Sequence, residues 1–288
     1  MSFSRNVKEE MARHMGNSRH CQLAELAALL HFCGQYGRCP DGGYTIGFQT
    51  ENEWIVKKGF TLLKKTFNIG TDAEIGEEQM REIFAKIGDL DQPVDPLLVK
   101  NACCQRAYLR GAFLSVGSIS DPKKGYHLEF VCPDNEKAVQ LQNILQNFDI
   151  DGKIVVRKKY HVVYLKESER IVDLLNVCEA HVALMEFENL RILKDVRNSV
   201  NRRVNCEAAN ITKTVNASSR QIEDILYIQE HGGFASLPEH LRLMASVRLE
   251  YPDAPLKELG QYLDPPVGKS GVNHRLNKLS EIAEKLRT

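Results

Sequence analysis

Two segments of the chain have a helical pattern but carry small side chains on the stripe that a buried helix normally fills with large ones. Residues 103–122 read CCQRAYLRGAFLSVGSISDP, and residues 21–35 read CQLAELAALLHFCGQ. The small residues are Gly111, Ala112 and Ser115 in the first stretch and Ala24, Ala27 and Ala28 in the second. Small side chains allow another backbone to approach closely. We therefore predict that the two helices pack directly against each other and that each opens one repeat of a mixed helix and strand domain.

The segments that follow each helix support two repeats. After residue 101 the pattern predicts a helix ended by Gly117 as a C′ glycine, the strand YHLEFVC, an Asp-capped helix, the hairpin KIVVRKKYHVVYLK and a last helix. The earlier unit continues with the strand YTIGFQT and the helix ENEWIVKKGFTLLKKTF, but then has only TDAEIGEEQMREIFAKIG. Either this repeat lacks about one hairpin, roughly 12–15 residues, or residues are absent from the numbering.

Between the repeats and the C-terminal region lies a basic segment with helical spacing. No Gly or Pro occurs from Lys153 to His231, and apolar residues recur every three or four positions from Leu190 to Val215. Residues 191–220 carry seven basic and two acidic side chains, including Arg197, Arg202 and Arg203. Asn is frequent here and favours caps and turns. We expect one or two helices at residues 191–216 that connect two domains and could follow a DNA backbone.

The C-terminal segment, 217–288, has the pattern of a helix-turn-helix. Helices are predicted at 217–230, 237–250 and 255–263, followed by the break DPPVG and a last helix that starts at KSGVNHRLNKL. The expected buried stripe of that helix is Val272, Leu276, Leu279, Ile282 and Leu286. The turn is longer than the common three or four residues.

The start of the last helix carries the groups that read DNA in such folds. Residues 265–280 contain basic side chains and no acidic one. In a helix-turn-helix the first residues of the second helix meet base edges, and its amide end meets phosphate. The predicted DNA-binding residues here are Lys269, Ser270, Gly271, Asn273, His274, Arg275 and Lys278, of which Asn273, His274 and Arg275 should select sequence and Lys269 and Lys278 should contact phosphate.

The paired helices resemble those of LAGLIDADG homing endonucleases, whose close interface carries one acidic metal ligand at each helix end. More closely, YLRGAFLSVGSISDPKKGYHLEF resembles the WhiA family of bacterial transcription regulators, which is built on a degenerate form of this domain. The resemblance continues through SFSRNVKEE, LAELAALLHFCG, RRVNCEAANITKT and LDPPVGKSGVNHRLNKL. It implies an α+β, two-repeat LAGLIDADG-like domain at 1–190 (repeats about 20–100 and 101–190), followed by an all-α helix-turn-helix domain.

The same resemblance decides the expected chemistry. Aligning Gly34 and Gly117 with the final glycine of the LAGLIDADG motif places Cys33 and Val116 at the metal-binding acid positions. Val116 cannot bind a metal ion, and a thiolate is a poor ligand for Mg²⁺. We therefore expect no catalytic residues, no metal, no cofactor and no small-molecule substrate.

Composition sets broad limits. The formal net charge is zero, so any basic surface must be local. No apolar run approaches the roughly 20 residues that span a bilayer. The eight cysteines form no CxxC pair or zinc-type spacing, and His20 with Cys21 and His31 with Cys33 are expected at core or edge positions.

The expected function is sequence-specific binding of promoter DNA in the bacterial cytoplasm, at the nucleoid, without enzymatic activity. The resemblance implies control of cell division or sporulation genes and leaves other transcription regulators open as partners. Two alternatives are a metal-dependent endonuclease and a protein-interaction scaffold that binds DNA weakly.

Overall fold

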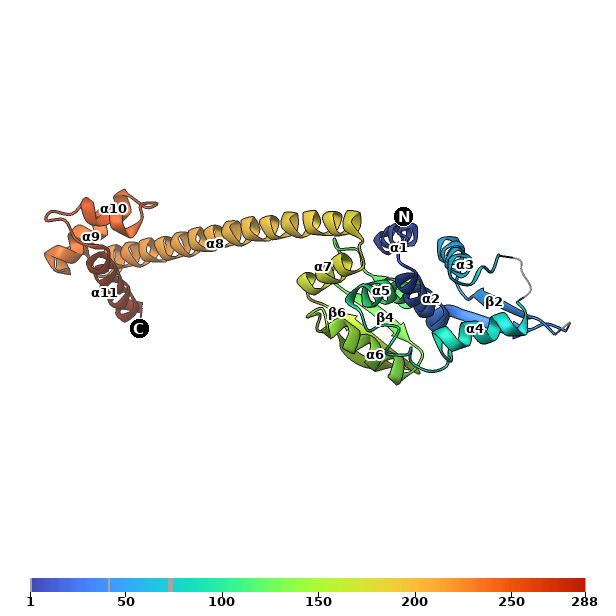
Figure 1. Ribbon diagram of the computed structural model, residues 1–288. Coiled ribbons are helices and arrows are strands. Elements are labelled where there is room, and N and C mark those ends of the chain that lie inside the picture. The colour runs from blue at the N-terminus through green and yellow to red at the C-terminus, as the bar shows by residue number, and fades with distance from the viewer. Residues whose placement is uncertain (1, 41, 72–74, 288) are drawn as a thin grey trace. The chain divides into compact units, whose positions relative to one another are not determined.

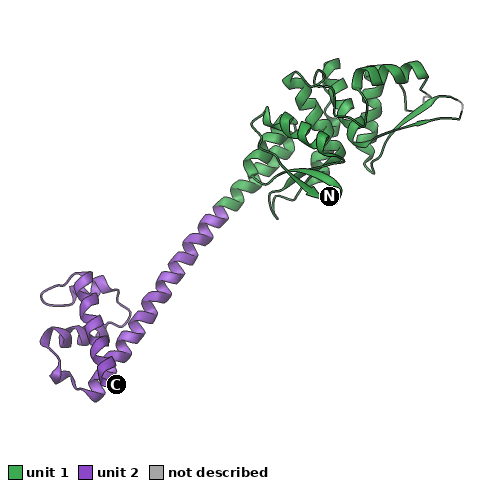
Figure 2. Cartoon of the chain, turned by 90° about the horizontal axis from the view of Figure 1, so that it is seen from below, with its two compact units in different colours: residues 1–195 green, residues 196–288 purple. Residues whose placement is uncertain are grey.

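The chain forms two compact units, residues 1–195 and 196–288, which Figure 2 shows in green and purple. The computed structural model describes residues 2–40, 42–71 and 75–287. Each unit has its own hydrophobic core, one built from residues 3–187 and the other from residues 225–283. Within the described residues, no helix is both long enough and apolar enough to cross a membrane.

The first unit is built around two adjacent helices, as the small residues predicted (Figure 1). Its elements are α1 (Phe3–Arg13), α2 (Arg19–Cys33), β1 (Gly34–Arg38), β2 (Tyr44–Phe48), α3 (Glu53–Phe67), α4 (Glu77–Ile87), α5 (Ala102–Val116), β3 (Gly117–Ile119), β4 (Leu128–Cys132), α6 (Asn135–Gln146), β5 (Lys153–Arg157), β6 (Tyr160–Leu165), α7 (Ser168–Val177) and the start of α8 (His181–His231).

The close packing of α2 on α5 explains the small side chains. A Cβ atom at Gly111 would lie 2.6 Å from the Glu25 carbonyl oxygen and 2.8 Å from the Ala28 Cβ, so only glycine fits there. Ala24 and Ala107 are buried in the same small cluster between the helices. The prediction that each helix is the neighbour of the other is confirmed.

The glycines that end these helices act differently from the prediction. Gly117 does not adopt the left-handed conformation of a C′ glycine, because its φ and ψ are −80° and 149°, and Gly34 is likewise extended. Each helix passes directly into a strand. A Cβ atom would then lie 2.6 Å from the Phe113 carbonyl oxygen at Gly117 and 2.5 Å from the Leu30 carbonyl oxygen at Gly34. The glycines are required by this close approach within the chain.

The two repeats carry sheets of different size. The second repeat has a four-stranded antiparallel sheet in the order β3-β4-β6-β5, with the predicted hairpin turning at Lys158 and Lys159. The first repeat has only the pair β1-β2, to which Ile75 adds one bridge at Tyr44. Both β1 and β3 were missing from the sequence prediction. Residues 72–74 of the TDAEIGEEQMREIFAKIG segment lie outside the described residues, and the described remainder forms the bridge and α4.

A buried ion network joins the paired helices to the rest of the unit. The Glu25 carboxylate, which is fully buried, accepts hydrogen bonds from Arg110 Nε at 2.9 Å and from Lys58 Nζ at 2.6 Å. Arg110 Nη1 also donates to Glu179 Oε2 at 2.5 Å. Lys58 Nζ donates as well to the carbonyl oxygens of Met11 and His14. Charged groups buried this deeply persist because each is paired.

The second unit contains the end of α8 and the remaining helices. These are the 3-10 turn η1 (Phe234–Ser236), α9 (Glu239–Glu250), α10 (Leu256–Gln261) and α11 (Lys269–Arg287). The separate helix predicted at 217–230 is the last part of α8, which also takes in residues 191–216. The predicted boundaries at 190 and 216 therefore fall inside one helix, and they stay predictions about where the functional domains separate.

Arg248 holds the second unit together from inside. Its guanidinium donates to Gln221 Oε1 on α8 at 3.0 and 2.9 Å and to the Ala254 carbonyl oxygen before α10 at 2.8 Å. The side chain is almost fully buried. It thus links the end of α8 to the helix-turn-helix that follows.

Candidate nucleic-acid interface

The first turns of α11 separate cleanly into a buried and an exposed side. Val272, Leu276 and Leu279 are buried in the core of the second unit. Of the seven predicted DNA-binding residues, Gly271 and Arg275 are half-buried and five are exposed: Lys269, Ser270, Asn273, His274 and Lys278. All seven therefore lie in or beside the solvent-facing side. At the far end of the helix the prediction for Leu286 is wrong, because that side chain is exposed and Ala283 is buried instead.

The long turn before α11 is held against α10 by its backbone. Val267 N donates to the Gly260 carbonyl oxygen at 2.9 Å. A Cβ atom at Gly260 would lie 1.9 Å from the Val267 carbonyl oxygen, so the turn can pack here only against glycine. The extra residues of the turn are therefore accommodated, and α11 keeps a defined position relative to α10.

The exposed side of α11 is positively charged and has little acidic compensation. Lys278 Nζ donates to Glu281 Oε2 at 3.1 Å, which is an exposed pair with a small energetic effect. Within residues 2–40, 42–71 and 75–287, no carboxylate forms an ion pair with Lys269 or Arg275. Both cations remain available for phosphate or a base edge.

The basic connector is exposed along its length. Arg197, Arg202 and Arg203 lie on α8 with exposed side chains, and so do the apolar residues that gave the helical spacing. The Asn-rich stretch that was expected to favour caps and turns is helical throughout. The exposed arginines can contact a phosphate backbone.

Comparison with known proteins identifies the family. Residues 19–80 match the model of the WhiA N-terminal LAGLIDADG-like domain, residues 105–197 match the WhiA LAGLIDADG-like domain, and residues 200–283 match the WhiA C-terminal helix-turn-helix domain. The "probable cell division protein WhiA" of Lachnoclostridium phytofermentans is 52% identical, with both chains covered completely. The protein of the same name from Alkaliphilus oremlandii is 48% identical over 99% of this chain and 98% of that protein. The chain belongs to the WhiA family.

The fold agrees with that assignment. The crystal structure of full-length WhiA from Thermatoga maritima matches with a TM-score of 0.58 at 26% identity over 99% of both chains.

The alignment with the Lachnoclostridium relative spans 312 positions, whereas this chain has 288 residues. Some positions of the WhiA relative therefore have no counterpart here, which agrees with a shortened repeat without locating the gap.

The helix ends that carry metal ligands in LAGLIDADG nucleases hold other groups in this WhiA protein. Cys33 and Val116 are the last residues of α2 and α5. The Cys33 thiol donates to Ser115 Oγ at 3.4 Å and to the Leu29 carbonyl oxygen at 3.2 Å. Burial raises the pKa of this thiol. Lys8 interacts electrostatically with it, and burial lowers the pKa of that lysine. A neutral thiol and a lysine are poor surroundings for a hard dication.

His31 and Asp121, which lie close in sequence to the C-terminal ends of α2 and α5, have structural contacts. His31 is buried, and its two ring nitrogens lie 2.9 Å from the Gln92 carbonyl oxygen and 3.2 Å from that of Ile87. This confirms the expected core position. Asp121 Oδ1 accepts from the Lys123 amide at 2.9 Å, as a turn residue does.

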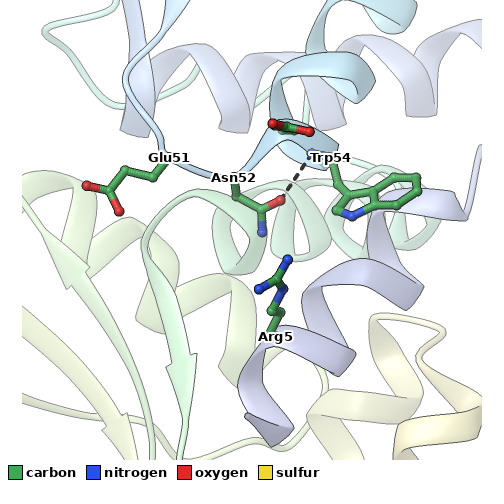
Figure 3. A pocket seen from close by; sticks show the side chains of 5 residues that line it. Arg5, Glu51, Asn52 and Trp54 are labelled. Atoms are coloured by element: carbon green, nitrogen blue, oxygen red, sulfur yellow. Dashed lines mark hydrogen bonds between the residues drawn. The ribbon is translucent and has the colours of Figure 1, made fainter. Parts of the chain in front are cut away.

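A pocket lies near the start of α3. Arg5, Asn52, Trp54 and the acidic residues Glu51 and Glu53 line a cavity of about 340 Å³. Figure 3 shows Arg5 directed toward Asn52, whose Oδ1 accepts from the Trp54 amide at 3.1 Å, whereas Glu51 points away. Because Glu51 points away, Arg5 and Asn52 are the labelled polar side chains that face each other in this pocket.

The opposite ends of α2 and α5 bring together residues that the sequence spacing did not connect. His20 and Cys21 begin α2, Cys103 and Cys104 begin α5, and their ligand atoms all lie within 4.8 Å of one another. In the described part of the chain this is the single group of three or more His, Cys, Asp or Glu side chains at such distances. The sequence analysis missed it because the two pairs are 83 residues apart.

Proposed function

We propose that this WhiA protein is a sequence-specific DNA-binding transcription regulator without nuclease activity, and that it controls genes of cell division or sporulation. The helix-turn-helix domain supports DNA binding. The relatives named cell division proteins support the first class of target genes. Sporulation rests on the family resemblance alone.

The observation that carries the proposal is the solvent-facing side of α11. It presents Asn273 and Arg275, which can form paired hydrogen bonds with adenine and guanine edges respectively. Lys269 and Lys278 lie on the same helix and can contact phosphate, which fixes the register without reading sequence. Basic and amide side chains with no acid between residues 265 and 280 suit a base-reading surface better than a protein docking surface.

The first unit offers a second, sequence-blind contact. The β5–β6 hairpin exposes Lys153, Arg157, Lys158 and Lys159, although Arg157 Nη1 donates to Glu129 at 2.7 Å. These side chains and the connector arginines could contact phosphates of the same DNA. Two linked contacts raise overall affinity even when only one reads sequence. We therefore assign 1–190 to backbone contact, 191–216 to the connector and 217–288 to sequence readout.

Selection from genomic DNA tests the function directly. Fragmented bacterial DNA incubated with the full chain should yield a small set of enriched fragments that share one motif and lie in promoters. Fluorescently tagged protein should localise to the nucleoid. Enrichment of no motif, together with capture of protein partners by the first unit, would favour the scaffold alternative.

The endonuclease alternative is tested by supercoiled plasmid with Mg²⁺ or Mn²⁺. We expect no nicking, because Cys33 and Val116 supply no carboxylate and Lys8 lies beside Cys33. Metal-dependent nicking that persists through a further purification step, and that disappears in the presence of EDTA, would overturn the absence of catalysis.

A further inference from the structure

The paired helices carry a cluster of metal-ligating side chains in their first turns. α2 starts at Arg19 and α5 at Ala102, so His20 and Cys103 occupy equivalent positions in the two repeats, and Cys21 and Cys104 occupy the next ones. Because α2 and α5 pack side by side, these equivalent positions meet across the helix interface. Three thiols and one imidazole thus come from two symmetrically placed pairs.

The distances place the imidazole among the sulfur atoms. His20 Nδ1 lies 3.2 Å from Cys104 Sγ, 3.4 Å from Cys21 Sγ and 4.0 Å from Cys103 Sγ. A single nitrogen atom therefore faces all three sulfurs. Cys104 and Cys21 also pack against the buried alanines Ala24 and Ala107, but packing alone does not require one nitrogen atom to face three sulfurs.

These separations lie within about 0.3 Å of the edge lengths of a tetrahedral metal site. Zn–S bonds of about 2.3 Å and Zn–N bonds of about 2.0–2.1 Å place neighbouring ligand atoms of a tetrahedron roughly 3.5–3.8 Å apart. The three nitrogen–sulfur distances lie around that range, and all four atoms lie within 4.8 Å. Small rotations of the side chains would therefore complete the coordination.

The donor set selects the class of ion. Three thiolates and one imidazole form a soft ligand set that suits Zn²⁺ and disfavours Mg²⁺ or Ca²⁺. Cys104 is buried, whereas His20 and Cys103 are exposed, so an ion can enter from solvent and end in contact with the interior.

We propose that His20, Cys21, Cys103 and Cys104 bind one Zn²⁺ ion that clamps the first turns of the two central helices together. Four protein ligands fill the tetrahedron and leave no open position for water, so the site is structural and not catalytic. The ion joins the two repeats at the end of the helix pair opposite to Cys33 and Val116. Binding displaces the thiol protons, so affinity falls as the pH is lowered.

Metal analysis of the full chain tests the proposal. Protein produced with added zinc and purified in a thiol-free reductant should retain about one zinc per chain by elemental analysis, with the number set by the single cluster. Replacing zinc by Co²⁺ should give the visible absorption of tetrahedral cobalt together with sulfur-to-cobalt charge transfer. The proposal is overturned if metal-free protein retains no zinc after Zn²⁺ is added and shows no tetrahedral cobalt absorption after Co²⁺ is added.

Variants locate the site. Cys103→Ser, at an exposed position, should fold as the parent does yet lose the tetrahedral cobalt spectrum, and Cys104→Ser should lose it as well. Cys206→Ser, another exposed cysteine, lies on α8 outside the cluster and is the matched control, which should keep both the spectrum and the zinc. Circular dichroism checks folding. Retention of the full cobalt spectrum by both cluster variants would contradict the assignment.

Thiol protection separates zinc binding from oxidation. Zinc should slow alkylation of Cys21, Cys103 and Cys104 in the native protein, and a chelator should restore it, while the rate at Cys206 stays unchanged. It should also raise the melting temperature of the parent but not of Cys103→Ser. Disulfide-linked peptides containing these cysteines in freshly reduced, zinc-treated protein would show that the cluster oxidises instead, which would also overturn the proposal.

Discussion

Two regions of the molecule, the helix pair of the first unit and the start of α11 in the second, use their charged residues in opposite ways. In the first unit, Glu25, Lys58 and Arg110 are buried between closely packed helices, and the carboxylates of Glu25 and the half-buried Glu179 balance the two cations. In the second unit, Lys269 and Arg275 lie at the start of α11 in a stretch that contains no acid. Buried, paired charges fix the geometry of a fold, whereas cations with no ion-pair partner are available for a ligand. The comparison separates a scaffold held by internal ion pairs from the helix that we propose reads DNA.

The largest effect is expected from breaking the buried network. Glu25→Ala would leave Lys58 and Arg110 without their shared carboxylate, which should lower the free energy of unfolding of the first unit by about 3–5 kcal/mol. Trp54 is the chain's single tryptophan and lies in this unit, so its fluorescence in a urea titration reports the loss.

Glu77→Ala is the matched control for that substitution. Glu77 pairs with Arg81 on the surface of α4, where both side chains are largely exposed. Its removal should shift the urea midpoint little. Equal shifts for the two variants would mean that the buried network does not hold the helix pair together.

Removing the first unit is expected to have the next largest effect, a loss of DNA affinity that separates the contributions of the two units. The fragment 205–288 keeps the complete core of the second unit but lacks the first unit and the three connector arginines. It should prefer the same motif as the full chain, bind it more weakly and have a shallower slope of log K against log salt. Each lost phosphate contact removes about 0.9 from that slope.

A longer fragment, 191–288, divides this effect between connector and platform. If Arg197, Arg202 and Arg203 contact phosphates, it should recover part of the slope that the shorter fragment loses. Matching slopes and affinities for the full chain and both fragments would show that the first unit and the connector do not touch DNA.

A smaller effect comes from His31 and depends on pH. Burial lowers the pKa of His31 below its ordinary value of about 6.5. His31 therefore binds a proton more readily in the unfolded state than in the folded state. The stability gained by keeping His31 neutral is fully present above pH 6.5, and it is lost as the pH falls from 6.5 toward the lower pKa of the folded state. The loss is at most about 1.4 kcal/mol per pH unit.

Trp54 fluorescence in urea between pH 7 and pH 5 measures this dependence. His31→Gln should flatten it, because the amide does not titrate in this range, even if the variant is less stable at pH 7. An unchanged dependence in this variant would assign the acid sensitivity to other groups.

The sequence predicted the helix pair because its small residues left a distinct pattern. It also predicted the β5–β6 hairpin, and Asp134 as the cap of α6 is confirmed by its hydrogen bond from the Lys137 amide at 2.8 Å. The strand β3 was missed because it has only three residues and follows a helix directly. The strand β1, GQYGR, was missed because glycine and polar residues hide its pattern.

Long-range contacts escaped the sequence analysis for a different reason. Nothing in the local pattern pairs Arg110 with Glu25, or the cysteines of α5 with those of α2, since these partners are more than 80 residues apart. Such contacts depend on how α2 and α5 pack. The small residues predict that the two helices touch, but not which side chains meet across them. The surface of α11, in contrast, depends on one helix and its spacing, so its exposed residues could be chosen from the sequence.

The central claim, that α11 selects the DNA sequence, is tested most directly by the ratio of affinities for the enriched motif and for random DNA of equal length. Asn273→Ala and Arg275→Ala should each lower this ratio. The free energy of discrimination that corresponds to it should fall by the roughly 1–3 kcal/mol that a paired base contact contributes. Arg242→Ala, which removes an exposed arginine of α9, is the control and should leave the ratio unchanged. The account is contradicted if both α11 variants keep the discrimination of the parent protein.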